Sequence, residues 1–267
     1  MREMRELARR TWPTGRWHAG GLAWNLHHHP DPDRPVRVWG AHAWGRLPEP
    51  GVLEWQVDPD HPLLAEEVLD WAEGDTGLTE VVAWSGEPHQ LDALTRRGYR
   101  HVPGPFFVRL ARGLDHLPTT SVPDGYRCAH VTEDLVPTRV DAHRAAWHPS
   151  RLTERTYHVV RADEPYREDL DRVVLAPDGT VAAYCLAWLD DGVGEFEPVG
   201  AHPDHRRLGL ARAACLDALH KLRDLGAHTA IVHARGDDAY PAPGRLYRSL
   251  GFLPTGQRTL TYRRPHR

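Results

Sequence analysis

Three arginines crowd the start of a predicted helix, at Arg206, Arg207 and Arg212. From Leu208 onward the apolar residues recur at helical spacing, and Gly226 stands where such a helix would end. A helix N-terminus carries unpaired N–H groups and partial positive charge, so cations there are unfavourable without an anion. A phosphate would accept hydrogen bonds from these N–H groups while the arginines neutralise its charge. The stretch therefore predicts a phosphate-binding turn; a solvated arginine face beside an ordinary glycine is the simpler alternative.

The segment before this helix predicts a β-hairpin. Val181–Leu189 and Val193–Gly200 are rich in strand-forming residues, and Asp190-Asp191-Gly192 between them is a turn signal. Pro198 cannot donate a hydrogen bond to a sheet, so it predicts a bulge in the second strand. A strand with an interrupted ladder thus leads into a helix whose start favours an anion.

Two short motifs accompany this arrangement. Arg206–Ala211 fits the pattern of a Gln or Arg, two residues, Gly, one residue, then Gly or Ala. Leu246–Phe252 fits Leu-Tyr-x-x-x-Gly-Phe. With the hairpin, these motifs make the chain resemble the GNAT acyltransferase superfamily over about Tyr126–Arg263. The resemblance implies an α/β fold whose mixed, mainly antiparallel sheet is flanked by helices.

The resemblance also implies acetyl-CoA as co-substrate and no metal. Its pyrophosphate would lie on backbone N–H groups of the turn, and its pantetheine arm would pair like an extra strand with the end of the second hairpin strand. The residues expected to bind it are Val199, Gly200, Ala201, Arg206, Arg207, Leu208, Gly209, Leu210, Ala211 and Arg212. Relatives often carry Asp-Asn before the last helix, where the Asn touches the cofactor; here the pair is Asp237-Asp238, so Asp238 is left out.

Acyl transfer to an amine needs a proton donor for the departing thiolate and a base for the ammonium. The resemblance implies Tyr247 as the acid, since a phenol of pKa ~10 can protonate a thiolate of similar basicity. Glu195 and Glu197 lie on one face of their strand, and paired carboxylates raise one pKa toward neutrality. Glu197, beside the expected bulge, is our choice of base; Glu195, His233 or water are the alternatives. As purely structural residues, Tyr247 would pack a helix and Glu197 would be an exposed carboxylate.

A helix-loop-helix is expected between Thr132 and Arg161, with Thr132 as N-cap and a break at Pro149. The resemblance implies that this region shapes the acceptor site. Its candidate substrate contacts, which could equally be core or surface residues, are His143, Trp147, His148 and Arg151.

The N-terminal part of the chain repeats the same order of elements. Strands are expected at Val36–Trp44, Val52–Val57 and Glu80–Trp84, and helices at His61–Glu73 and His89–Arg97. Residues 55–72 can be laid against 197–218, and 92–99 against 245–252, which indicates an internal duplication.

This first copy has lost the motif residues. Pro62-Leu63-Leu64-Ala65 replaces the phosphate turn, and Leu94 falls at the place of Tyr247. We therefore expect a tandem GNAT protein: residues 1–118 as a degenerate copy that forms one wall of the substrate cleft, and residues 119–267 as the acetyl-CoA-binding unit. The Pro- and Gly-rich stretch Gly113–Gly125 is the expected linker.

Composition limits the partners, the cellular location and the metal sites that the chain could have. The 267 residues carry a formal net charge of −4, which favours neither nucleic acid nor an anionic membrane surface as a partner. The N-terminus lacks the apolar stretch of a signal peptide, and the three scattered cysteines fit a reduced cytoplasm. Cys185 and Cys215 are expected to be buried packing residues. His27-His28-His29, with Asp31 and Asp33, offers metal-binding atoms, but on a Pro/Asp-rich loop rather than on fixed elements.

The function expected from the sequence is N-acetylation of a primary amine, most simply of a small molecule, by direct transfer in a ternary complex. A non-catalytic acyl-CoA sensor and a pseudoenzyme are the alternatives. The acceptor, the acyl chain preference and the choice between monomer and dimer are left open.

Overall fold

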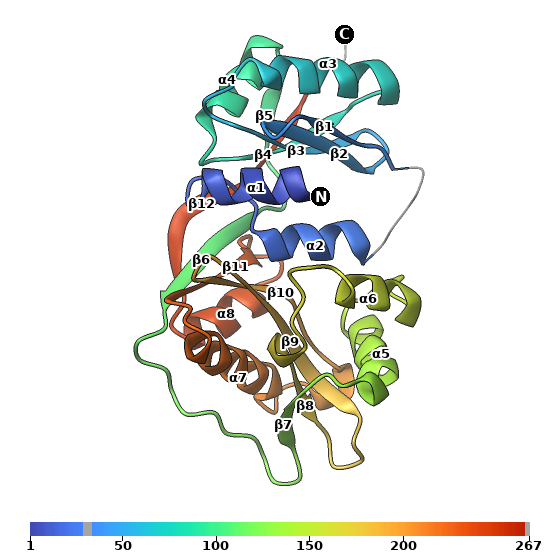
Figure 1. Cartoon of the computed structure of the whole chain (residues 1–267), viewed down its shortest axis with the longest axis vertical. Coiled ribbons are helices and arrows are strands. Elements are labelled where there is room, and N and C mark those ends of the chain that lie inside the picture. Colours follow the sequence, from blue (N-terminus) through green and yellow to red (C-terminus); the bar gives the residue numbers. More distant parts are fainter. Residues whose placement is uncertain (29–33, 265–267) are drawn as a thin grey trace.

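The protein is described by a computed structural model that covers residues 1–28 and 34–264. Its strands form one continuous sheet in the order β1-β2-β3-β4-β12-β6-β11-β10-β9-β8-β7, and β5 pairs with β12. Two helix-covered halves of this sheet are stacked along the long axis of the molecule (Figure 1). The fold is the expected α/β arrangement, mixed and mostly antiparallel.

The N-terminal half follows the expected order closely. The strand expected at Val36–Trp44 is divided by a turn at residues 40–42. The helix begins at Leu64 rather than His61, because residues 61–63 form a turn first. The elements after the N-terminal helices are β1 (Val36–Trp39), β2 (Ala43–Glu49), β3 (Val52–Val57), α3 (Leu64–Thr76), β4 (Glu80–Trp84), α4 (Pro88–Arg96), β5 (Arg100–Val102) and β6 (Phe107–Gly113).

The C-terminal half carries the helix-loop-helix, the hairpin and the predicted phosphate helix. Its elements are β7 (Arg127–His130), η1 (Glu133–Leu135), α5 (Val136–Ala146), α6 (Glu154–Arg161), η2 (Glu168–Leu170), β8 (Asp171–Leu175), β9 (Val181–Asp190), β10 (Val193–Ala201), η3 (Pro203–His205), α7 (Leu210–Asp224), β11 (Thr229–Arg235), α8 (Ala242–Ser249) and β12 (Leu253–Arg263). Apolar clusters lie on both faces of this sheet, one under α7 and one under α5 and α6.

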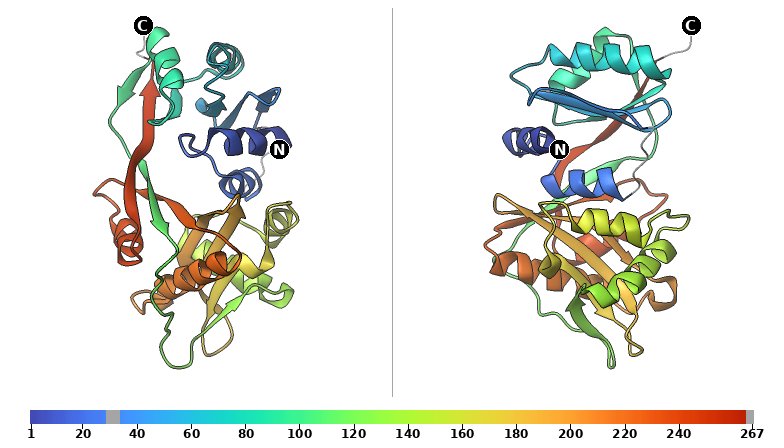
Figure 2. Two further views of the ribbon diagram at one scale, coloured as in Figure 1. Left: turned by 60° about the vertical axis from the view of Figure 1, so that its left-hand side comes forward. Right: turned by 45° about the vertical axis from the view of Figure 1, so that its right-hand side comes forward.

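The two halves exchange their last strands. β6 pairs antiparallel with β11 of the C-terminal half, and β12 pairs antiparallel with β4 of the N-terminal half. β6 and β12 also pair with each other, and the long β12 runs from one half to the other (Figure 2). The domain boundary expected at residue 118 stays a prediction. Strands from each side of it pair with strands from the other side.

Two helices that the sequence patterns had not indicated precede this sheet. α1 (Arg2–Thr11) buries Met4, Leu7 and Ala8 on one face. α2 (Ala19–His27) lies on β9 and β10 of the C-terminal half. Both helices lie between the two stacked halves in Figure 1.

The ladder registers define which positions of the two halves correspond. Val52–Glu54 pair in parallel with β4, as Val193–Glu195 pair in parallel with β11. Glu54 therefore corresponds to Glu195, and Gln56 to Glu197. The sequence alignment paired Trp55 with Glu197. The ladder registers pair Gln56 with Glu197 instead, so the alignment is shifted by one residue here.

Candidate functional site

The sheet of the C-terminal half opens where β10 and β11 separate. Their parallel ladder runs only from Val193 to Glu195, while β10 stays paired with β9 as far as Ala201. The β9–β10 register shifts between Phe196 and Val199, which confirms the predicted bulge at Pro198. The β10 backbone at Val199–Ala201 is thus paired on the β9 side, and its β11 side is open to an extended ligand.

The start of α7 has the geometry of an anion-binding turn. Gly209, its N-cap residue, has φ +77°, and Arg207 has φ +64°; turns with left-handed residues of this kind can present peptide N–H groups to an anion. No side chain caps the helix, and no acidic residue lies in its first turn. Residues 206–209 are exposed, and no hydrogen bond or ion pair joins the side chains of Arg206, Arg207 and Arg212 to any described residue. Gly226 closes the helix with φ +90°, as expected.

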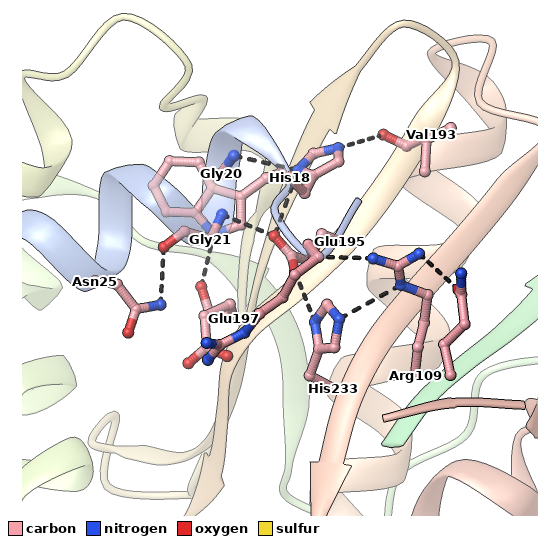
Figure 3. Close-up of polar contacts among 12 residues, drawn as sticks. His18, Gly20, Gly21, Asn25, Arg109, Val193, Glu195, Glu197 and His233 are labelled. Carbon is pink, nitrogen blue, oxygen red and sulfur yellow. Dashed lines mark hydrogen bonds and ion pairs between the residues drawn. The ribbon is translucent and has the colours of Figure 1, made fainter. Parts of the chain in front are cut away.

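Glu195 is a buried, ionised carboxylate with several partners (Figure 3). Its Oε2 accepts a hydrogen bond of 2.7 Å from the Gly21 N–H and lies 3.4 Å from His18 Nδ1. Its Oε1 lies 3.2 Å from His233 Nδ1. Burial opposes ionisation, but the interactions with His18 and His233 outweigh it and hold the pKa of Glu195 well below its usual range.

Glu197 contrasts with Glu195 on the same strand. Its carboxylate makes no hydrogen bond or ion pair with the described residues; only its backbone carbonyl accepts one, from Trp188 Nε1 at 2.6 Å. The residue is only partly buried. Burial, and then the charge of Glu195, raise its pKa to about 8. Glu197 is therefore a desolvated carboxyl group that a substrate can still reach.

Tyr247 lies on α8, packed edge-on against Phe252 at 5.8 Å between ring centroids. Burial raises the pKa of its phenol well above the usual value, so the free protein holds it protonated, as an acid must be. Cys185, Cys215 and Glu197 are among the groups that influence it electrostatically. Both cysteines are fully buried, which confirms them as packing residues.

His233 is engaged at both ring nitrogens. Nδ1 faces Glu195, and Nε2 lies 3.4 Å from the donor Nε of Arg109. Burial lowers the pKa of His233, so the ring is neutral, with its acceptor nitrogen already occupied by Arg109. This arrangement weakens His233 as an alternative base.

The corresponding place in the N-terminal half lacks this chemistry. Gln56 replaces Glu197 and donates to Thr11 Oγ1 at 2.8 Å. Leu94 corresponds to Tyr247 and is fully buried in the core. The turn before α3 contains no residue with positive φ, and its Leu63 is exposed.

The candidate acceptor residues do not gather at one point. The buried His143 faces the Tyr184 hydroxyl, 2.9 Å from Nδ1, whereas Trp147 is 53% exposed. Arg151 lines a cavity of about 480 Å³ together with Asn25 of α2 and Arg46 of β2. Sequence reasoning missed the contribution of α2, because a Gly- and Trp-rich segment far from the motifs gave no local signal.

The histidine-rich stretch is only partly described. His27 Nε2 lies 3.2 Å from Asp163 Oδ2, and His28 stacks on Trp24; His29, Asp31 and Asp33 lie outside the described residues.

A second set of metal-type side chains comprises His42, Asp58 and His61. Asp58 Oδ2 already accepts hydrogen bonds from Arg10 at 3.1 Å and His42 at 3.0 Å. This set is accounted for as an ion-pair network that fastens α1 to the N-terminal sheet. Each helix within residues 1–28 and 34–264 is too short or too polar to cross a bilayer.

A model of the acetyltransferase (GNAT) family matches residues 133–252. Mycothiol acetyltransferase from Paenarthrobacter aurescens is 28% identical over 222 residues, covering 77% of this chain and 68% of the relative. The enzyme of the same name from Nocardia farcinica is 29% identical over 195 residues, covering 69% and 60%. This chain thus spans about two thirds of the length of these relatives.

Solved structures show the same fold. A GCN5-related N-acetyltransferase from Sphaerobacter thermophilus superposes with a TM-score of 0.64 at 20% identity, over 85% of this chain and 79% of the other. A tandem GNAT protein from the clavulanic acid biosynthesis pathway gives 0.64 at 16% identity, over 97% and 92%. The second likeness extends over both halves of the chain.

Proposed function

We propose that the protein transfers an acetyl group from acetyl-CoA to the primary amine of a small molecule. Residues 133–252 match the acetyltransferase (GNAT) family model, and the fold is similar to that of a tandem GNAT protein. The observation that carries this proposal is the opening between β10 and β11, which has the uncapped start of α7 beyond it and Glu197 on its β10 side.

The residues around the opening fit the co-substrate. The uncapped N–H groups of α7 and the unpaired arginines 206, 207 and 212 would hold the pyrophosphate. A Cβ at Gly209 would meet nothing within 4 Å, so the turn leaves room for a phosphate. The free edge of Val199–Ala201 would pair with the pantetheine arm as an added strand. When bound, acetyl-CoA supplies a thioester whose carbonyl carbon the amine attacks.

Two side chains would move the protons. Glu197 takes a proton from the ammonium of the acceptor, directly or through water, which frees the nitrogen lone pair for attack. The C–N bond forms and the C–S bond breaks, and Tyr247 gives its proton to the departing thiolate sulfur. The nitrogen loses its second proton as the amide forms, and the phenolate regains a proton, both through solvent. Tyr247 is offered from the Leu246–Phe252 motif and Glu197 from its place beside the bulge of its strand, and the surroundings of each residue support these roles.

A small acceptor fits the relatives and the cavity. The curated relatives are named for acetylation of a small thiol compound, mycothiol. The cavity beside α2 is lined by groups of both charges, including Arg34, Arg46, Arg151 and Glu49. We therefore propose a polar small-molecule amine rather than a protein.

Turnover tests the proposal. Purified protein is mixed with acetyl-CoA and a panel of polar primary amines, and release of the CoA thiol is measured with and without each amine. We expect amine-dependent thiol release. Tight CoA binding by calorimetry with no turnover across the panel would instead support an acyl-CoA sensor, and absence of both would support a pseudoenzyme.

A further inference from the structure

The N-terminal helix α2 is attached to the catalytic strand by Glu195. Gly21 lies in the first turn of α2, and its N–H donates to Glu195 Oε2 at 2.7 Å. A carboxylate at a helix N-terminus satisfies an unpaired N–H and complements the helix dipole. His18, the N-cap residue, places Nδ1 3.1 Å from Gly20 N and 3.4 Å from Glu195 Oε2, and directs Nε2 to Val193 O at 3.2 Å.

The close packing of α2 on the sheet depends on glycine. A Cβ at Gly20 would overlap the Trp188 ring, and one at Gly21 would lie 2.6 Å from Glu195 Oε2. Asn25 donates to the Gly21 carbonyl one turn further on, and Asn25 also lines the cavity described above. The Glu195 contact therefore sets the position of a helix that reaches toward the proposed acceptor side of the site.

Glu195 is itself held from the opposite side. His233 contacts its Oε1, and Arg109 contacts His233. Arg109 is buried between the rings of Trp12 and Trp84, and it donates to Pro13 O at 2.7 Å and to Gly15 O. This chain of contacts joins the segment before α2 to the strand that carries Glu195 and Glu197.

We propose that Glu195 is a positioning residue, which seats α2 at the acyl-transfer site and keeps a fixed negative charge beside Glu197. This inference rests on the proposed function. It removes Glu195 from the candidate bases, because its carboxylate is occupied at both oxygens. It also makes residues 12–25, which include the first part of α2, a supporting part of the active site.

The N-terminal half supplies a matched comparison. Glu54, the register equivalent of Glu195, is bound by Arg16 at 3.0 Å and by Arg46. Burial opposes its ionisation, but Arg46 and Arg16 outweigh it and lower its pKa to about 2. Arg16 and His18 therefore attach one short segment to equivalent strands of both halves. Glu54 has the buried charge and the anchoring role of Glu195, but its half lacks a catalytic carboxylate.

The effect of the Glu195 charge on the pKa of Glu197 can be separated from the effects of the other groups nearby. The charged and titratable groups that influence Glu197 are Glu195 on its own strand, Arg16 before α2, Tyr184 on β9 and Tyr247 on α8. Those around Glu195 are His18, His233 and Arg109. Loss of the Glu195 charge makes ionisation of Glu197 easier, so the acid limb of the pH–rate profile moves to lower pH.

The test compares four variants in kcat/KM against pH, with the same amine. Glu195→Gln should move the acid limb down by about one pH unit, since it removes a neighbouring negative charge. Glu195→Asp keeps the charge but draws it back from Gly21, so kcat should fall about tenfold with the acid limb unmoved. The controls Glu54→Gln and Glu54→Asp should leave the acid limb in place. Because Glu54 lines the cavity together with its partner Arg46, a change in KM for the amine or in thermal stability is expected, but no change in the pH of the acid limb.

Each outcome decides the inference. An acid limb unmoved in folded Glu195→Gln, or moved equally by Glu54→Gln, would overturn the charge role. Should Glu195→Gln fail to fold, Glu195→Asp decides alone, and wild-type kcat in that variant overturns the positioning role.

Hydrogen exchange separates this inference from the proposed function. Exchange of the α2 amides should quicken in Glu195→Asp and not in Glu54→Asp. Failure of wild-type turnover would refute the proposed function, whereas normal wild-type turnover with unchanged α2 exchange in Glu195→Asp would refute only the role of Glu195.

Discussion

At the scale of single residues, Glu195 and Glu197 show how one strand can hold two carboxylates in opposite states. They lie two residues apart on β10. Glu195 has three polar neighbours, Gly21, His18 and His233, whereas the Glu197 carboxylate has no hydrogen-bond partner among the described residues. Sequence spacing could place them together. It could not separate their roles, because the groups that hold Glu195 come from α2 and β11, far away in the chain.

Replacing Glu197 by Gln keeps its shape but removes the proposed proton acceptor. Because positioned proton transfer contributes ~10²–10⁴-fold, kcat/KM near pH 8 should fall within that range. A carboxyl of pKa about 8 is protonated below that pH, so wild-type activity should rise through pH 8 and the variant should lose this limb. The deficit should shrink at high pH, where the amine is already neutral. Wild-type rates at neutral pH in pH–rate measurements would move the base to His233 or water.

Tyr247→Phe removes only a hydroxyl group. Packing against Phe252 and CoA affinity should be nearly unchanged, while kcat falls by ~10²–10⁴-fold. High pH should not rescue this variant, because the thiolate still departs unprotonated. Steady-state kinetics with calorimetry decides the matter; full activity would leave Tyr247 as a packing residue.

At the scale of elements, the start of α7 was the most predictable feature of the site. Its arginines, its glycine and the preceding bulge are local in sequence, and local patterns determine turns and helix ends. α1 and α2 were missed for the opposite reason: the two glycines of α2 matter only because the Trp188 ring and Glu195 lie against them.

Gly209→Glu should abolish CoA binding by placing a negative side chain where the phosphates would lie. Gly209→Ala is the matched control. It shares the strain of positive φ, about 1 kcal/mol, without the charge, and should keep most of the affinity. Calorimetry on folded variants measures both. Equal affinities for wild type and Gly209→Glu would reject the phosphate site.

The N-terminal half should bind no CoA of its own. The turn before α3 has no arginine and no residue with positive φ, whereas the turn before α7 has both. Titration should therefore give one CoA per chain. Two equivalents would show that the degenerate turn still binds a phosphate.

At the scale of the whole molecule, the sequence indicated the duplication but not the exchange of β6 and β12. Both segments have strand composition. The sequence of a strand does not determine which strand it pairs with, so each could pair within its own half or with the other half. The pairing is decided by contacts between residues more than a hundred positions apart, such as Leu110 with Val232.

The exchange predicts that neither half folds alone. Residues 1–118 would lack β12 beside β4 and carry β6 without its β11 partner. We expect this fragment to be unfolded or aggregated by circular dichroism and size-exclusion chromatography. Co-expression with residues 119–267 should restore a one-to-one complex, and a stable isolated fragment would contradict the prediction.

The exchanged strand also orders events during synthesis. β12 is synthesised after the other described elements, yet it pairs with β4, made some 180 residues earlier (Arg263 with Glu80). One edge of β4 therefore stays unpaired until β12 has been synthesised. A chain released before β12 is made would lack the strand that pairs with β4 and β6. The exposed strand edge of such a chain would be a binding site for chaperones and a target for proteases.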